Sequence, residues 1–94
     1  MAEYIDESAV LQRALDTYGS DLQIVVTMEE MSELQKELRK YLRGKYSPAS
    51  IAEEIADVEI MLEQMKMLFC CADDVRSVRR CKVERLKERL DNDN

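Results

Sequence analysis

Strong turn-forming residues are scarce in this chain of 94 residues, and that scarcity limits the folds open to it. The whole sequence holds two glycines and one proline, namely Gly19, Gly44 and Pro48. An all-β domain needs a tight turn about every 8 to 12 residues, so the sequence argues against that class. The stretches between the three residues are long enough for helices, and we therefore predict an all-α protein.

Apolar residues recur with helical periodicity in four segments. We expect helices over Glu7–Thr17, Leu22–Leu42, residues 48–69 and Val75–Leu90, with a polar break at residues 72–74 as a cap before the last one. The chain is thus predicted to be a single domain of four helices.

Short polar segments mark the expected helix ends. Ser20 or Asp21 is a suitable cap for the second helix, and Gly44 is typical of a helix C-terminus. Ser47 followed by Pro48 is typical of an N-cap and first helical position, so the third helix is expected to begin there.

The connection between the second and third helices has only five residues, 43–47. Two long helices joined so closely must fold back antiparallel, which predicts a central helical hairpin. Apolar stripes occur on all four helices, and on the second helix the stripe consists of Met31, Leu34, Leu38, Tyr41 and Leu42. We therefore expect the chain, one domain over residues 1–94, to assemble into an oligomeric helical bundle.

Charge is distributed unevenly along the chain. Residues 1–75 carry 7 Lys and Arg against 16 Asp and Glu, whereas residues 76–94 carry 7 against 4. An acidic body disfavours nucleic acid, because binding requires neutralised phosphates. The basic last segment is expected to be a solvated helix face, or one that pairs with an acidic neighbour.

Missing residue types exclude several chemistries. The chain has no histidine, which rules out catalytic triads, imidazole-bound zinc and ferritin-type iron sites. No apolar run approaches the roughly 20 residues of a membrane span. The first residues lack the pattern of a signal peptide, so we expect none. The three cysteines, Cys70, Cys71 and Cys81, form no disulfide pattern, so we expect reduced thiols and a cytoplasmic protein.

Carboxylates gather on the facing sides of the predicted hairpin. Glu30 and Glu33 lie one turn apart at the edge of the second helix's apolar stripe. On the third helix Glu54 lies inside the apolar stripe, and Asp57 lies one turn further along, at its edge. An uncompensated carboxylate in an apolar face costs several kcal/mol. Four carboxylates from two helices favour a hard divalent cation, Mg²⁺ or Mn²⁺.

A plainer alternative stays open for the same residues. Glu30, Glu33 and Asp57 would then be solvated, and Glu54 would form a salt bridge with a lysine or arginine.

The acidic pattern resembles a known family. Glu29-Glu30-x-x-Glu33, then 20 residues, then Glu54-x-x-Asp57 is similar to the signature of the MazG-type all-α nucleoside triphosphate pyrophosphohydrolases. The resemblance implies Mg²⁺ bound by Glu30, Glu33, Glu54 and Asp57, and hydrolysis of a nucleoside triphosphate, ribo- or deoxyribo-, to monophosphate and pyrophosphate. It also implies a homodimer or homotetramer.

Further roles are assigned to three residues beside the acids. Glu29 neighbours the cluster and is the candidate for the base that accepts a proton from the attacking water, with an ordinary solvated glutamate as the alternative. Lys36 and Lys40 continue the same helix and are candidates for contacting substrate phosphates, although each is also an ordinary surface lysine. No glycine-rich phosphate loop exists, so a P-loop mechanism is excluded.

A second class of function fits the composition equally well. The chain would then be a non-enzymatic helical dimerisation or interaction module, or a regulator that binds nucleotide without cleaving it. Glu54 discriminates between the classes, because an interaction module gains nothing from a carboxylate within its apolar stripe.

Overall fold

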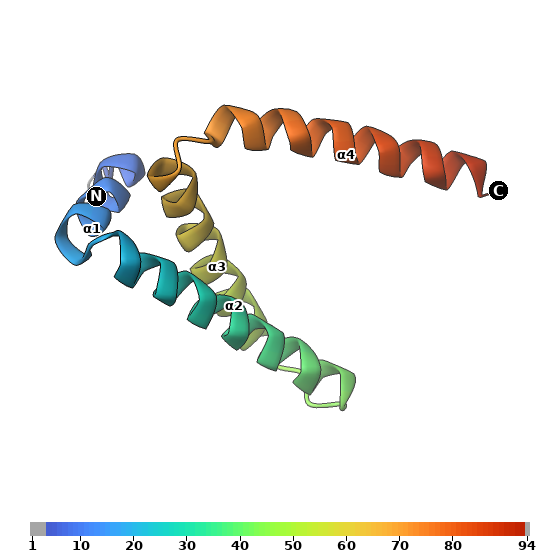
Figure 1. Cartoon of the computed structure of the whole chain (residues 1–94). Coiled ribbons are helices and arrows are strands. Elements are labelled where there is room, and N and C mark those ends of the chain that lie inside the picture. The colour runs from blue at the N-terminus through green and yellow to red at the C-terminus, as the bar shows by residue number, and fades with distance from the viewer. Residues whose placement is uncertain (1–3, 94) are drawn as a thin grey trace.

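The computed structural model describes residues 4–93, and within them the chain forms four α-helices and no strand. The helices are α1 (Glu7–Tyr18), α2 (Ser20–Leu42), α3 (Pro48–Leu68) and α4 (Ala72–Asn92) (Figure 1). The predicted all-α class and the four helices are thereby confirmed. None of the helices in this range is both long and apolar enough to cross a membrane.

The chain between α2 and α3 follows its predicted local signals. Gly44 adopts a φ of 83°, a conformation that favours glycine, and its N–H donates to the Tyr41 carbonyl at 2.9 Å. Ser47 is the N-cap of α3 and accepts from the Ser50 N–H at 3.3 Å, with Pro48 at the first helical position. Both predicted helix ends are confirmed.

Two other predicted caps are wrong. Ser20 and Asp21 lie inside α2, whose N-cap is Gly19 with a φ of 88° and no side-chain cap. α4 begins at Ala72, three residues before the predicted start, so the acidic side chains there lie in its first turn. Carboxylates are favourable in a first turn because they face the positive end of the helix dipole, which explains a helix that starts without a side-chain cap.

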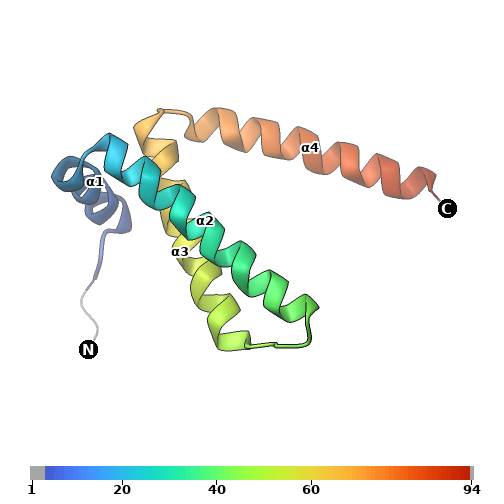
Figure 2. The same cartoon turned by 60° about the horizontal axis from the view of Figure 1, so that its bottom comes forward.

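Helices α2 and α3 pack against each other, and α1 packs across both (Figures 1 and 2). The Tyr41 and Tyr46 rings meet edge to face, 5.2 Å apart, where α2 gives way to the connecting segment. α4 contacts only α3 among the helices and extends away from the other three (Figures 1 and 2). The radius of gyration is 16.8 Å, against about 12 Å for a compact domain of this length.

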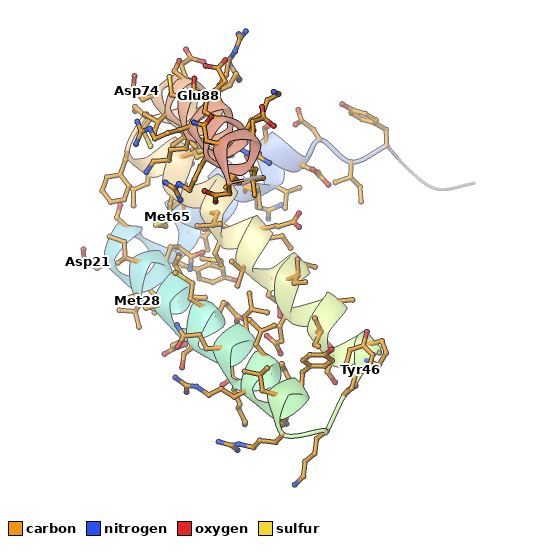
Figure 3. All side chains as sticks on the ribbon, turned by 90° about the vertical axis from the view of Figure 1, so that its right-hand side faces the viewer. Asp21, Met28, Tyr46, Met65, Asp74 and Glu88 are labelled. Carbon is orange, nitrogen blue, oxygen red and sulfur yellow. The ribbon has the colours of Figure 1, made fainter. Side chains whose placement is uncertain are left out.

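The single chain buries few apolar side chains. Leu15 and Met61 are the only buried apolar residues within residues 4–93. The apolar stripe predicted for α2 is mostly exposed, with Leu34 alone half-buried among its five members. Met28 also points away from α3 (Figure 3) and is 58% exposed. The apolar surface of these helices therefore exceeds what one chain can cover.

Candidate metal centre

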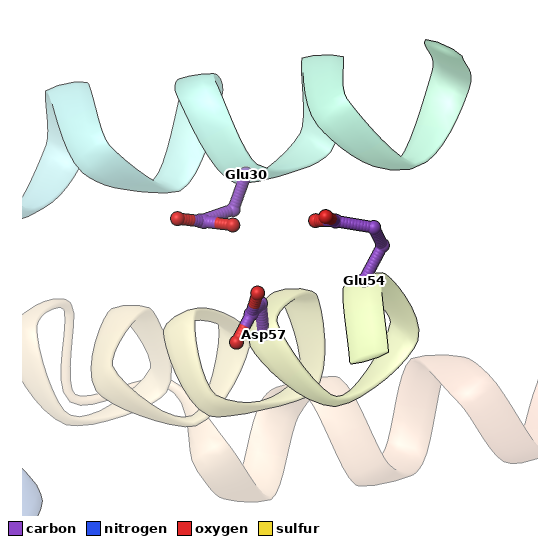
Figure 4. Close-up of side chains that lie close together, drawn as sticks. All are labelled: Glu30, Glu54 and Asp57. Carbon is purple, nitrogen blue, oxygen red and sulfur yellow. The ribbon is translucent and has the colours of Figure 1, made fainter. Parts of the chain in front are cut away.

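Three carboxylates from two helices converge between α2 and α3. Glu30 extends from α2 toward α3, and Glu54 and Asp57 extend from α3 toward it (Figure 4). One oxygen from each of the three lies within 4.8 Å of the other two. All three side chains are half-buried.

The rotation of the two helices produces this convergence. Thr27 and Met61 are both 6% exposed, and each lies one turn from a carboxylate, Thr27 before Glu30 and Met61 after Asp57. Residues three or four apart share a helix face, so burying Thr27 and Met61 turns the neighbouring carboxylates into the same contact. The Thr27 hydroxyl donates to the Gln23 carbonyl at 2.7 Å, which satisfies a polar group buried there.

Glu30 therefore lies within the face that α2 turns toward α3. Sequence periodicity placed it at the edge of an apolar stripe, but the half-buried residues of α2 include Val26, Glu30, Leu34 and Glu37 at helical spacing. The face is thus rotated toward the acidic side of α2, and the apolar stripe is left partly in solvent.

The pKa values of two of these carboxyls are raised. Burial raises the pKa of Glu30 above its ordinary value, and repulsion from Asp57 and a hydrogen bond to it act in the same direction. Burial also raises the pKa of Glu54, followed by repulsion from Asp57 and then from Glu30. Each carboxyl is therefore harder to ionise because of the others.

No side-chain cation compensates this cluster in the part of the chain from residue 4 to residue 93. The salt bridges there join other residues, and none includes Glu30, Glu54 or Asp57. A salt bridge from Glu54 to a lysine or arginine, the plainer alternative considered from sequence, is therefore not formed in this structure.

The remaining acids of the motif lie beside the cluster. Glu33 is exposed and outside the group of three, yet its charge contributes to the raised pKa of both Glu30 and Glu54. Glu29 is also exposed, and its charge contributes to the raised pKa of Glu30 only. Both residues lie near the cluster, and Glu33 affects the pKa of a cluster carboxyl on each of the two helices.

The two lysines proposed to contact phosphate differ in their surroundings. The Lys40 ammonium forms a salt bridge of 3.1 Å with Glu37 on its own helix. Lys36 is exposed and enters no salt bridge within residues 4–93. Lys36 is thus the freer of the two to meet an anion.

Sequence reasoning did not single out the buried polar residues that continue from the cluster. Gln23, Thr27 and Gln64 are each less than 7% exposed, and the Gln64 Oε1 accepts no hydrogen bond. Their signal was spacing, since Gln23 and Thr27 lie seven and three residues before Glu30, and Gln64 lies seven after Asp57. Polar residues at that spacing lie on the same side of each helix as the carboxylates of the cluster.

The donor set fits a hard divalent cation. Carboxylate oxygens are the protein ligands that Mg²⁺ prefers, at about 2.1 Å, so two oxygens on opposite sides of the ion lie about 4.2 Å apart. Three oxygens on one octahedral ion include at least two adjacent pairs, which lie about 3.0 Å apart. Oxygens that lie within 4.8 Å of one another would therefore have to move closer together, by side-chain rotation, to bind the ion. Three protein ligands leave positions for water and for phosphate oxygens.

No protein-family model, curated protein or solved structure matches the chain.

Proposed function

We propose that the chain is a Mg²⁺-dependent hydrolase that converts a nucleoside triphosphate, ribo- or deoxyribo-, to the monophosphate and pyrophosphate. The observation that carries the proposal is the convergence of Glu30, Glu54 and Asp57, without a compensating cation, between α2 and α3. The likeness of the acidic motif to the MazG-type pyrophosphohydrolases supports the choice of reaction.

Each acid has a role in this proposal. Glu30, Glu54 and Asp57 hold the ion, and Glu33, which acts on the pKa of two of them, completes the ligand set. Mg²⁺ (or Mn²⁺) held there would supply neutralisation of charge on the triphosphate and a lower pKa for coordinated water. Glu29 is exposed beside the cluster and accepts the proton of the attacking water on its carboxylate.

Phosphate binding involves positive side chains further along α2. Lys36, exposed and without a salt bridge in the described chain, contacts the phosphates that extend beyond the ion. Lys40 joins it when its ammonium leaves Glu37. Attack at the α-phosphorus then releases pyrophosphate, whereas attack at the γ-phosphorus would release phosphate.

We further propose that α2 and α3 form an antiparallel hairpin that assembles with other copies into a homodimer or homotetramer. The mostly exposed apolar stripe of α2 supports this assembly, because contact with another chain would remove it from water. The three free thiols suit a reducing, cytoplasmic compartment.

Phosphorus NMR of nucleoside triphosphates with protein and Mg²⁺, repeated with EDTA, tests the reaction. We expect pyrophosphate and monophosphate only when metal is present. Glu54→Gln and Asp57→Asn should each abolish turnover with unchanged circular dichroism, whereas Glu88→Gln should retain it. Glu88 is a suitable control because it is an exposed carboxylate on α4, away from the cluster (Figure 3). Full activity in either cluster variant would exclude the assigned site, and diphosphate with free phosphate would exclude the assigned bond.

The second candidate function is a non-enzymatic helical dimerisation module, or a regulator that binds nucleotide without cleaving it. The observation that favours it is the amount of apolar side chain left exposed on all four helices. The same NMR experiment separates the two candidates, because the module leaves every triphosphate intact.

A further inference from the structure

α4 presents an apolar face that its own chain does not cover. The helix contacts α3 alone, and its apolar side chains are between 37% and 59% exposed. These side chains lie along one side of the helix: Val75, Val78, Val83, Leu86 and Leu90. A face of this width is typical of a helix that packs against another surface.

The cations of α4 fall into two groups. Arg76, Arg80 and Lys87 form salt bridges of 3.0, 3.4 and 2.6 Å with acids of the same helix. The other four form no salt bridge within residues 4–93: Arg79, Lys82, Arg85 and Arg89.

The unpaired cations share the apolar face. At about 100° per residue, all four fall within about 80° of Val75 around the helix axis. Arg79 and Lys82 line the same shallow hollow as Val78 and Leu86, and Asp74 is the one acidic residue in its lining. The uncovered side of α4 is therefore apolar and basic at once, and a complementary surface would be apolar and acidic.

Such a surface exists between α1 and α3. The groove there is lined by apolar side chains together with three glutamates: Ile5, Val10, Leu11, Ala56, Ile60, Glu7, Glu59 and Glu63. Glu63 is held by Lys66 at 2.8 Å, whereas Glu7 and Glu59 form no salt bridge in residues 4–93. The groove thus offers apolar contacts beside unpaired negative charge.

The exposed area indicates how much surface has to be covered. The accessible surface is 7979 Å², whereas a compact monomer of this mass exposes about 5600 Å². The excess is about 2400 Å² per chain, which lies in the range that obligate dimers bury per partner, about 1000–2500 Å². α4 is about 32 Å long and accounts for a large part of that uncovered surface.

We propose that α4 of one chain occupies the α1–α3 groove of a second copy, and that the second copy returns the contact. Arg79 and Lys82 then face Glu7 and Glu59, while the valines and Leu86 cover the apolar lining. A reciprocal exchange of this kind closes with two-fold symmetry and leaves no free groove. The inference refines the proposed assembly and is independent of the metal site. A result that excludes the exchange of α4 therefore leaves the proposed hydrolysis standing, and the reverse also holds.

The wild-type protein allows a direct test by zero-length carbodiimide cross-linking, which joins a lysine to a carboxylate that it touches. Unlabelled and ¹⁵N-labelled protein are mixed, denatured, refolded together and cross-linked. We expect peptides that join Lys82 to Glu59 or Glu7 with one heavy and one light partner. Absence of these links, or links between partners of the same isotope only, would overturn the proposal.

Charge reversal gives a second test, read by light-scattering mass. Glu7→Lys with Glu59→Lys, and separately Arg79→Glu with Lys82→Glu, should each weaken the dimer about tenfold or more, because like charges then meet. A mixture of the two variants should recover the wild-type mass, since both contacts of the mixed dimer have opposite charges. The proposal is wrong if each variant keeps the wild-type mass. It is also wrong if the wild-type mass returns only when all four substitutions are placed in one chain, because the contact would then lie within a chain and not between two copies.

The matched control places the same charge change beside the apolar face of α4, at about 100° and 140° around the helix axis from Val75. Arg76→Glu with Arg80→Glu lies on the face that already pairs with acids of the helix itself. This control should keep the wild-type mass, and its dissociation to the same extent as the Arg79 and Lys82 variant would overturn the assignment of the basic face.

Discussion

Replacing Asp57 by asparagine should make the protein more stable without metal and less stable with it. Asp57 lies within 4.8 Å of both Glu30 and Glu54, as measured between carboxylate oxygens, and no cation of the described chain pairs with the three. Without metal, and at a pH where all three groups are ionised, its charge repels the other two carboxylates. With Mg²⁺ the same carboxylate becomes a ligand of the ion. The effect of the substitution on stability therefore changes sign when the metal is added.

The size of the metal-free effect follows from the distance. Two charges 4.8 Å apart repel by about 0.9 kcal/mol in the dielectric of water. Physiological salt reduces this to about 0.5 kcal/mol. We count only the Glu30–Asp57 pair, and the repulsion from Glu54 adds in the same direction. Asp57→Asn should therefore raise the Tm in EDTA by at least about 2–4 °C.

Mg²⁺ should reverse which of the two proteins, wild type or Asp57→Asn, has the higher Tm. A site with a Kd of about 1 mM stabilises the folded wild type by about 1.4 kcal/mol in 10 mM Mg²⁺, or about 6–11 °C in Tm. The variant lacks one ligand and should gain far less, so its Tm should fall below that of the wild type.

Thermal melts followed by circular dichroism measure the Tm in EDTA and in Mg²⁺. Both series use one fixed protein concentration, because assembly makes the Tm depend on concentration. Glu88→Gln removes one negative charge away from the cluster, so it should change the Tm by the same amount in EDTA and in Mg²⁺. If Asp57→Asn melts at or below the wild type in EDTA, the carboxylates do not repel as argued. If Mg²⁺ stabilises both proteins equally, the cluster does not bind it.

Three further predictions concern pH and the α2–α3 contact. The pKa values of Glu30 and Glu54 are raised on folding, so the folded metal-free protein binds more protons than the unfolded chain does. The extra bound protons stabilise the fold at low pH. That stabilisation is lost as the pH rises from about 4.5 through the raised pKa. Melts in EDTA should show the wild type losing stability relative to Glu30→Gln over that rise, and a constant difference would contradict the raised pKa. Met61→Ala should destabilise by about 2–5 kcal/mol in urea unfolding, because Met61 is one of two buried apolar residues between residues 4 and 93. A cost below about 1 kcal/mol would mean that α3 packs elsewhere. Gln64→Met should stabilise by about 1 kcal/mol in the same assay, since the buried Gln64 Oε1 accepts no hydrogen bond, and a loss would mean that this oxygen has a partner in solution.

Local sequence signals account for most of the secondary structure. The bond from the Ser50 N–H to Ser47, the fixed φ of Pro48 and the positive φ of Gly44 act within a few residues, so these helix ends were predictable. The start of α2 was not, because Ser20 and Asp21 offer cap side chains but the chain turns one residue earlier, at Gly19.

The candidate site was predictable in its residues but not in its grouping. Helical spacing brings Glu30 near Glu33 and Glu54 near Asp57 whatever the tertiary structure. Which of them meet depends on how α2 and α3 rotate about their axes, and that rotation is fixed by the burial of Thr27 and Met61. Sequence alone therefore could not separate the three converging carboxylates from Glu33 beside them.

Four helices, with carboxylates on two neighbouring ones, follow from the sequence alone, because turn residues, caps and apolar periodicity act over a few residues each. The burial of Gln23 and Thr27, the exposure of Leu38 and Tyr41, and the contact of α4 with α3 alone depend on how the helices pack and could not be predicted from the sequence. The physical reason is that periodicity identifies an apolar face without identifying its partner. A face that its own chain leaves uncovered carries the same pattern as one that it buries.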